Sequence, residues 1–187
     1  MPSSSDAGAG LAARIPAAAR TVLEIAEASS SRAPELRARG VRVEARAVAG
    51  IAGVAPGAFD AVLLDGVLEG AEDPAYLLEQ LAAALAPGGA AVASVPNVGH
   101  WSVILGLLGA GGEATPRLVK GPRRFFTRAT LGDVFDAAGL EIVEVFEILR
   151  PAPPEQAAAV ARLAAFPGAS PDLDVAEFHV IARRAEV

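Results

Sequence analysis

The chain has 187 residues and a formal net charge of −6, so it lacks the excess positive charge that a general nucleic-acid binder needs for phosphate contacts. It has no cysteine, which excludes disulfides and thiolate catalysis, and its two histidines are too few for a histidine-rich metal site. The most apolar run, residues 103–110, is far shorter than the ~20 residues that span a bilayer, and no targeting segment is evident. We expect one cytoplasmic domain over residues 1–187, with residues 1–7 disordered and no membrane contact.

The first half of the chain alternates between helical and extended patterns. In chain order the residues predict a short helix over 8–15, a buried strand over 21–26, a helix over 31–39, a half-exposed strand over 41–48 and a buried strand over 59–65. Asp73 as N-cap and Pro74 at the first position then predict a helix that runs to Leu85.

The second half continues the alternation. After the "APGG" turn the residues predict a buried strand over 90–95, a helix over 98–108, a basic loop over 109–124, a helix over 127–138, a strand over 141–149, a helix over 154–165 and a strand over 176–183. Strands that alternate with helices in this way predict an α/β fold with a mostly parallel sheet. Sites in such sheets lie at the carboxyl ends of the strands.

Residues 59–103 carry a more specific pattern. Phe59-Asp60 opens a strand, Val67-Leu68-Glu69 follows it, and residues 85–89, "LAPGG", lead into the next strand. Together with "SVPNVGHWSV" and "RFFTRATL", these motifs resemble class I S-adenosylmethionine-dependent methyltransferases, in particular a bacterial, small-molecule type. The resemblance covers roughly residues 11–150 and implies a Rossmann-like three-layer α/β/α sandwich.

The resemblance is weakest where the family holds its cofactor. The family pattern has glycines at alternate positions after the first strand, and here those positions read Ala26, Ala28 and Ser30. Glycine allows close backbone approach and positive φ, which side chains with a Cβ disfavour. Glu27 adds a negative charge near the expected cofactor carboxylate. Glu24 and Asp65, at the ends of two buried strands, complete the degenerate cofactor site that the resemblance implies.

The next two family features are also altered. The resemblance implies an acidic ribose ligand at the end of the second strand, where this chain has Ala47 and Val48. The family normally has two strand–helix units between the first strand and Phe59, and this chain has room for one. We therefore expect a sheet shortened at one edge.

Several polar residues leave alternatives open. Asn97 and His100 would be the catalytic candidates of an active enzyme and Trp101 a wall of its acceptor pocket; otherwise His100 begins a helix and Trp101 is buried. Glu24 either contacts a cofactor or caps backbone N–H groups. Asp65 and Glu69 form an acid/base pair or, as we favour, are solvated loop carboxylates. His179 is interpreted as structural.

These features favour a methyltransferase-like protein that has lost S-adenosylmethionine binding and acts through a protein partner or a homo-oligomer, with no cofactor expected. The alternative is an active enzyme that uses S-adenosylmethionine through a divergent loop on a small-molecule acceptor. Binding of another ligand in the emptied crevice is a third interpretation.

Overall fold

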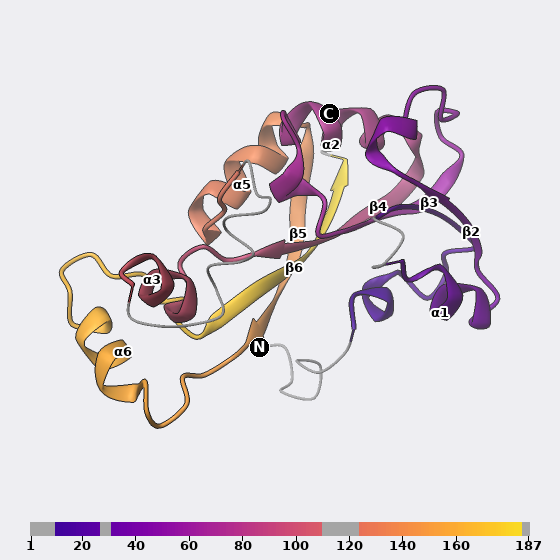
Figure 1. Ribbon diagram of the computed structural model, residues 1–187. Coiled ribbons are helices and arrows are strands. Elements are labelled where there is room, and N and C mark those ends of the chain that lie inside the picture. The colour runs from indigo at the N-terminus through magenta and orange to yellow at the C-terminus, as the bar shows by residue number, and fades with distance from the viewer. Residues whose placement is uncertain (1–9, 27–30, 110–123, 185–187) are drawn as a thin grey trace.

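The structure is a computed structural model that describes residues 10–26, 31–109 and 124–184. Its centre is a six-stranded sheet with the order β2-β1-β3-β4-β6-β5 (Figure 1). The strands are β1 (Thr21–Ala26), β2 (Arg42–Arg46), β3 (Phe59–Asp65), β4 (Leu85–Pro96), β5 (Leu140–Leu149) and β6 (Val175–Arg184). The pairs β1–β2, β1–β3 and β3–β4 are parallel, whereas β6 runs antiparallel to both β4 and β5. The predicted mostly parallel α/β sheet is confirmed.

Helices cover both faces of this sheet, as the three-layer prediction requires. The helices α2 (Pro74–Ala84) and α5 (Arg128–Ala137) lie on one face, and α1 (Ala33–Ala38) with the 3-10 turn Leu11–Arg14 lies on the other (Figure 1). The remaining helices are α3 (Trp101–Leu107) and α6 (Ala157–Ala164), with further 3-10 turns at Val48–Gly50 and Leu68–Gly70.

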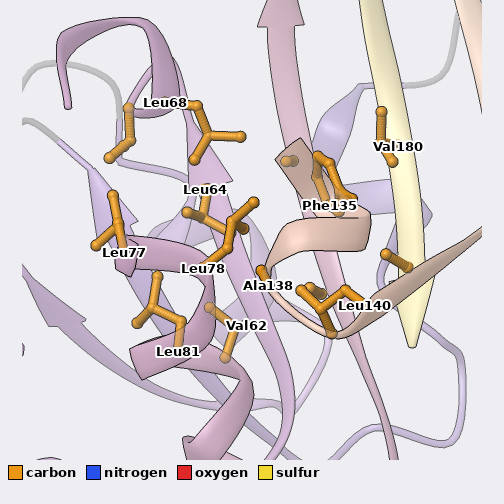
Figure 2. Close-up of a cluster of buried hydrophobic side chains, with 14 of the residues drawn as sticks. Val62, Leu64, Leu68, Leu77, Leu78, Leu81, Phe135, Ala138, Leu140 and Val180 are labelled. Carbon is orange, nitrogen blue, oxygen red and sulfur yellow. The ribbon is translucent and has the colours of Figure 1, made fainter. Parts of the chain in front are cut away.

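The larger core fills the space between the sheet and the α2–α5 layer. Leu77, Leu78 and Leu81 recur at helical spacing on α2, so one face of this helix meets Val62 and Leu64 of β3 (Figure 2). Phe135 is fully buried beside them. Asp73 caps α2 by accepting the Tyr76 N–H at 3.0 Å, as the sequence predicts.

The short edge of the sheet agrees with the predicted loss of one strand. Among the described residues between β1 and β3, the only strand is β2, which spans five residues and forms the edge. β2 ends at Arg46, and Ala47 leads into the 3-10 turn at Val48–Gly50. The Glu44 carboxylate is paired with the guanidinium of Arg46, 2.5 Å away. The last residue of β2 and the two that follow it, Arg46, Ala47 and Val48, carry no carboxylate of their own.

The strand β4 differs from its prediction at one end. The sequence predicts a strand over 90–95 after an "APGG" turn, but the structure begins β4 at Leu85. Leu85 is the register partner of Phe59, and a bulge between Phe59 and Ala61 accommodates the extra residues. Gly88 has φ of 76°, a conformation that favours glycine, so the predicted turn lies within the bounds of β4, which begins at Leu85.

Candidate functional site

The strand order places a topological switch point at β1, and we call the region beside the carboxyl ends of β1 and β3 the crevice. The chain leaves β1 to form β2 on one side and later returns to form β3 on the other side, so the connections diverge at the carboxyl end of β1. Ligands of open α/β sheets bind at such a switch point. Ala26, the last residue of β1, is half-buried and is the register partner of Asp65 at the end of β3. Ala28 and the neighbouring residues 27, 29 and 30 lie outside the described part of the chain.

Glu24 stands at this crevice with its side chain fully buried. The Ser31 hydroxyl donates to one carboxylate oxygen of Glu24 at 2.6 Å, and the Arg32 backbone N–H donates to the other oxygen. Ser31 and Arg32, just before α1, therefore lie against β1. Both oxygens serve the start of α1, as the predicted capping alternative for Glu24 requires.

Asp65 forms the other side of the crevice. Its Oδ2 accepts a hydrogen bond from Arg32 Nε at 2.7 Å, and its Oδ1 accepts one from the Ser94 hydroxyl at 2.9 Å. The side chain of Asp65 is 12% exposed, so the interpretation as a solvated loop carboxylate is wrong. Hydrogen bonding to Asp65 raises the pKa of Arg32 above its ordinary value. The ion pair Arg32–Asp65 crosses from the start of α1 to the end of β3.

Asn97 lies directly after β4 and is 3% exposed. Its amide Nδ2 donates to the carbonyl oxygens of Asp172 at 3.0 Å and Val175 at 2.8 Å, and its Oδ1 accepts the Gly99 N–H at 2.9 Å. These contacts engage both the nitrogen and the oxygen of the side-chain amide. They join the end of β4 to the segment that enters β6, so the amide serves the backbone in this structure.

His100 is the N-cap of α3 and is 2% exposed. Its Nδ1 accepts the Ser102 N–H at 3.3 Å and lies 2.8 Å from the Ser102 hydroxyl, while Nε2 lies 2.9 Å from the Arg150 carbonyl oxygen. This pattern selects the neutral ring with its proton on Nε2. Burial lowers the pKa of His100 below its ordinary value. A ring with both nitrogens engaged must break a contact before it accepts a substrate proton.

Trp101 shares the same carbonyl oxygen. Its indole Nε1 donates to the Arg150 carbonyl at 2.8 Å, and its ring centroid lies 5.1 Å from that of His100. Trp101 is half-buried. The structure thus brings Trp101 and His100 together at the end of β5, whereas Glu24 and Asp65 lie together at the ends of β1 and β3.

Two residues of the crevice were missed by the sequence analysis. Ser94 is the lone polar residue in the apolar run "AAVASV", and that signal could have identified it. Arg32 carries no local signal, because its partner Asp65 lies 33 residues away.

Within residues 10–26, 31–109 and 124–184, no group of three or more histidine, aspartate or glutamate side chains is arranged to hold a metal ion. Within the same ranges no helix has the length and apolar character to cross a membrane.

Solved structures share this fold at low sequence identity. A Burkholderia thailandensis 1,6-didemethyltoxoflavin-N1-methyltransferase, with bound 1,6-didemethyltoxoflavin and S-adenosylhomocysteine, has a TM-score of 0.58 at 18% identity, over 90% of this chain and 72% of that chain. A chain from the complex between the Haloferax volcanii Trm112 methyltransferase activator and a methyltransferase has a TM-score of 0.61 at 15% identity, over 95% and 87%. A methyltransferase from Archaeoglobus fulgidus has a TM-score of 0.61 at 12% identity, over 89% and 87%.

None of the curated proteins matches this chain. The model of a methyltransferase domain family matches residues 7–145, which is well over half of the chain. Together with the fold, this match confirms the resemblance to S-adenosylmethionine-dependent class I methyltransferases. The chain belongs to the methyltransferase domain family.

Proposed function

We propose that this methyltransferase-like protein does not bind S-adenosylmethionine in the manner of its family and acts as a non-catalytic binding or regulatory partner. In this proposal it is a single cytoplasmic domain of a bacterial protein, and it works through its surface with a protein partner or a second copy of itself. Its ancestral crevice serves the stability of the fold rather than a cofactor.

The observation that carries the proposal is the occupation of the crevice by the chain's own polar groups. Both carboxylate oxygens of Glu24 accept hydrogen bonds, from the Ser31 hydroxyl and the Arg32 backbone N–H. Both oxygens of Asp65 accept hydrogen bonds as well, from the Arg32 guanidinium and the Ser94 hydroxyl. A cofactor that needs these carboxylates must compete with bonds already made. The first glycine after β1 is Gly40, so residues 24–39 offer no bare backbone for close approach.

The unequal preservation of sequence features gives further support. The helix caps and the apolar faces that build the core follow the family pattern, as Asp73 at α2 and the Thr127–Thr130 capping box at α5 illustrate. The positions that would touch a cofactor depart from it at Ala26 and at the end of β2. A scaffold that keeps its packing while its ligand-contacting positions change supports a role other than catalysis.

An active methyltransferase with a divergent loop is the second candidate, because the ion pair that crosses the crevice is partly exposed. The side chain of Arg32 is 45% exposed, and such pairs stabilise a fold by only about 0–1 kcal/mol. Arg32 could therefore swing out at low cost. Asn97, His100 and Trp101 would then position a small-molecule acceptor, since a sulfonium donor needs alignment more than a strong base.

A partner role has a parallel among the structural neighbours. The Haloferax volcanii chain comes from a complex of a methyltransferase with an activator protein.

Another neighbour, SpnF, is described as a [4+2]-cyclase, with a TM-score of 0.54 at 18% identity. The fold is thus found in a protein named for a reaction other than methyl transfer, and fold alone does not assign activity.

Calorimetric titration with S-adenosylmethionine and S-adenosylhomocysteine tests the proposal. We expect no binding heat from either ligand with the natural chain. Micromolar binding of either ligand, which corresponds to about −8 kcal/mol, would contradict the proposal and favour the active enzyme. The variant Arg32→Ala is a useful companion, because it removes the guanidinium that crosses the crevice. Binding by the variant alone would identify the ion pair as the obstacle and would leave the proposal for the natural chain intact.

A further inference from the structure

The strand β5 forms one edge of the sheet, and β6 is its neighbour in the strand order. In an antiparallel ladder about half of the main-chain N–H and C=O groups of an edge strand point away from its neighbour. Among the described residues, none outside β6 makes a hydrogen bond with the main chain of β5. We call this outer side of β5 the free edge. Its main-chain groups are available to a further strand.

The two edges of the sheet differ in length and in exposed side chains. β2 spans five residues, and its Glu44 and Arg46 pair with each other. β5 spans ten residues and carries Val143 and Leu149, which are 50% and 55% exposed. A short strand with charged side chains resists association, whereas a longer strand with exposed apolar side chains favours it. The free edge of β5 is therefore where a further strand fits best.

A bulge at Val143 limits where a further strand can pair. The ladder between β5 and β6 skips this residue, because Ile142 and Glu144 are the register partners of consecutive residues on β6. From Glu144 to Ile148 the register is unbroken. A further strand therefore has a regular template along residues 144–148.

The charges of β5 indicate what kind of strand fits. All the charged residues of β5 are glutamates. Glu147 is paired with Arg128 of α5. Glu141 and Glu144 are exposed and form no ion pair among the described residues. Their register partners on β6 are two residues apart, so both carboxylates stand on the same face of the sheet.

The basic side chains around β5 leave these two glutamates unpaired. Arg128 is shared between Glu147 and Asp172, and Arg14 is 6% exposed and stacks over an aromatic ring of β5. An added strand would lie about 5 Å from β5 and about 10 Å from β6, so the charges of β5 act on it most strongly. The remaining basic residues lie on β6 or beyond the regular run, and they are Arg150, Arg183 and Arg184.

The same glutamates disfavour a second copy of this chain at the free edge. Pairing β5 with β5 of another copy would bring two sets of glutamates together, and like charges on adjacent strands destabilise the pairing. A strand with lysine or arginine at alternate positions instead presents opposite charge to Glu141 and Glu144, because alternate residues share one face.

We propose that the free edge of β5 binds an extended protein segment that carries lysine or arginine at alternate positions. The segment adds a strand to the sheet along residues 144–148 through main-chain hydrogen bonds. Its basic side chains face Glu144, and its apolar side chains lie on the other face beside Val145, which is half-buried. The inference rests on the proposed function for the role of a protein partner, and it names the surface and the chemistry of that partner.

Amide hydrogen exchange of the full chain, followed by nuclear magnetic resonance, tests the inference. The probe is a hexapeptide of alternating valine and lysine with blocked ends. At saturation it should slow the exchange of the outward N–H groups of residues 144–148 by at least about tenfold and leave those of β2 unchanged. The same peptide with N-methylated main-chain amides at alternate positions should give no protection. Absence of protection on β5, or equal protection by the N-methylated peptide, overturns the inference.

Charge-reversed variants test the choice of a basic partner. Glu144→Lys should weaken binding of the lysine peptide by about tenfold. Glu79→Lys makes the same change at an exposed position on α2 and should leave the affinity unchanged. A hexapeptide of alternating valine and glutamate should bind the natural chain about tenfold more weakly than the lysine peptide. Equal affinity for the two peptides contradicts the inference. Circular dichroism checks the folding of both variants, and the two peptides on the natural chain decide if Glu144→Lys does not fold.

Two further outcomes are distinguishable from these. Protection of the β5 amides that rises with protein concentration, without peptide, would identify a second copy as the occupant and overturn the inference. Sedimentation equilibrium of the natural chain would then show a dimer. Binding of S-adenosylmethionine would overturn the proposed function without changing the response of β5 to the lysine peptide.

Discussion

Replacing Glu24 by glutamine separates a structural carboxylate from a ligand-binding one. The substitution keeps the size of the side chain and removes its charge. In the structure the carboxylate accepts hydrogen bonds from the Ser31 hydroxyl, at 2.6 Å, and from the Arg32 backbone N–H. The glutamine carbonyl oxygen can accept from the Arg32 N–H, but its NH₂ group can only donate, so the Ser31 hydroxyl would have to turn and accept, and both bonds would lose their charged acceptor.

The expected loss follows from this exchange. Hydrogen bonds to a charged acceptor contribute about 1.5–3 kcal/mol each, against about 0.5–1.5 kcal/mol for a neutral acceptor. Relief of the buried charge offsets part of the loss, because Glu24 is fully buried. We expect the free energy of unfolding to fall by about 1.5–3 kcal/mol. For a chain of this length that corresponds to a melting temperature lower by about 3–12 °C.

Urea unfolding followed by circular dichroism measures this change. Glu44→Gln is the matched control, because the Glu44 side chain is 45% exposed and pairs with Arg46 at the edge of the sheet. The control should change the free energy of unfolding by less than about 0.5 kcal/mol. A carboxylate retained for a ligand would cost stability in the free protein. A neutral or stabilising effect of Glu24→Gln would therefore refute the structural role that we assign to this residue.

Three further predictions concern residues outside the crevice. The pKa of His100 is lowered mainly by burial, so below about pH 6.5 the unfolded chain binds more protons than the folded chain. When unfolding is measured from about pH 7.5 down to about 5.5, the free energy of unfolding should decrease as the pH decreases, by at most ~1.4 kcal/mol per pH unit. His100→Gln should reduce this slope. The pKa of Asp60 is lowered first by the Arg20 N–H and then by the hydroxyl and N–H of Thr21. Its contribution is present above about pH 4 and is lost as the pH falls further, so Asp60→Asn should flatten acid unfolding; an unchanged acid limb would contradict this. Asn97→Ala leaves three backbone groups without their partner and should lower the free energy of unfolding, measured in urea, by about 2–4 kcal/mol. A loss below about 1 kcal/mol would contradict the role of Asn97 in connecting β4 to the segment before β6.

Local sequence patterns predicted most of the fold. The run "FDAVLLD" predicts a strand over 59–65, and β3 has these bounds. Asp73-Pro74 and Thr127 fix where α2 and α5 begin, because capping acts within one turn of the helix. The early start of β4 was not predicted, since it depends on the pairing of Leu85 with Phe59 across the sheet.

The site was less predictable, because its contacts join distant parts of the chain. Sequence alone named Glu24 and Asp65 but gave no means of seeing that Arg32 links them, 33 residues before Asp65. The ring of His100 similarly meets the carbonyl of Arg150, 50 residues later. Residue type and position identify candidates, whereas the partner that decides a side chain's role is set by the topology of the sheet.

The central claim is that the carboxyl end of β1 no longer admits the adenosyl donor. A crystal structure grown with saturating S-adenosylhomocysteine tests it most directly. We predict an unliganded crevice, with Arg32 on Asp65 and with Ser31 on Glu24. Continuous density for the nucleoside against residues 24–32, with the Arg32–Asp65 ion pair broken, would contradict the claim.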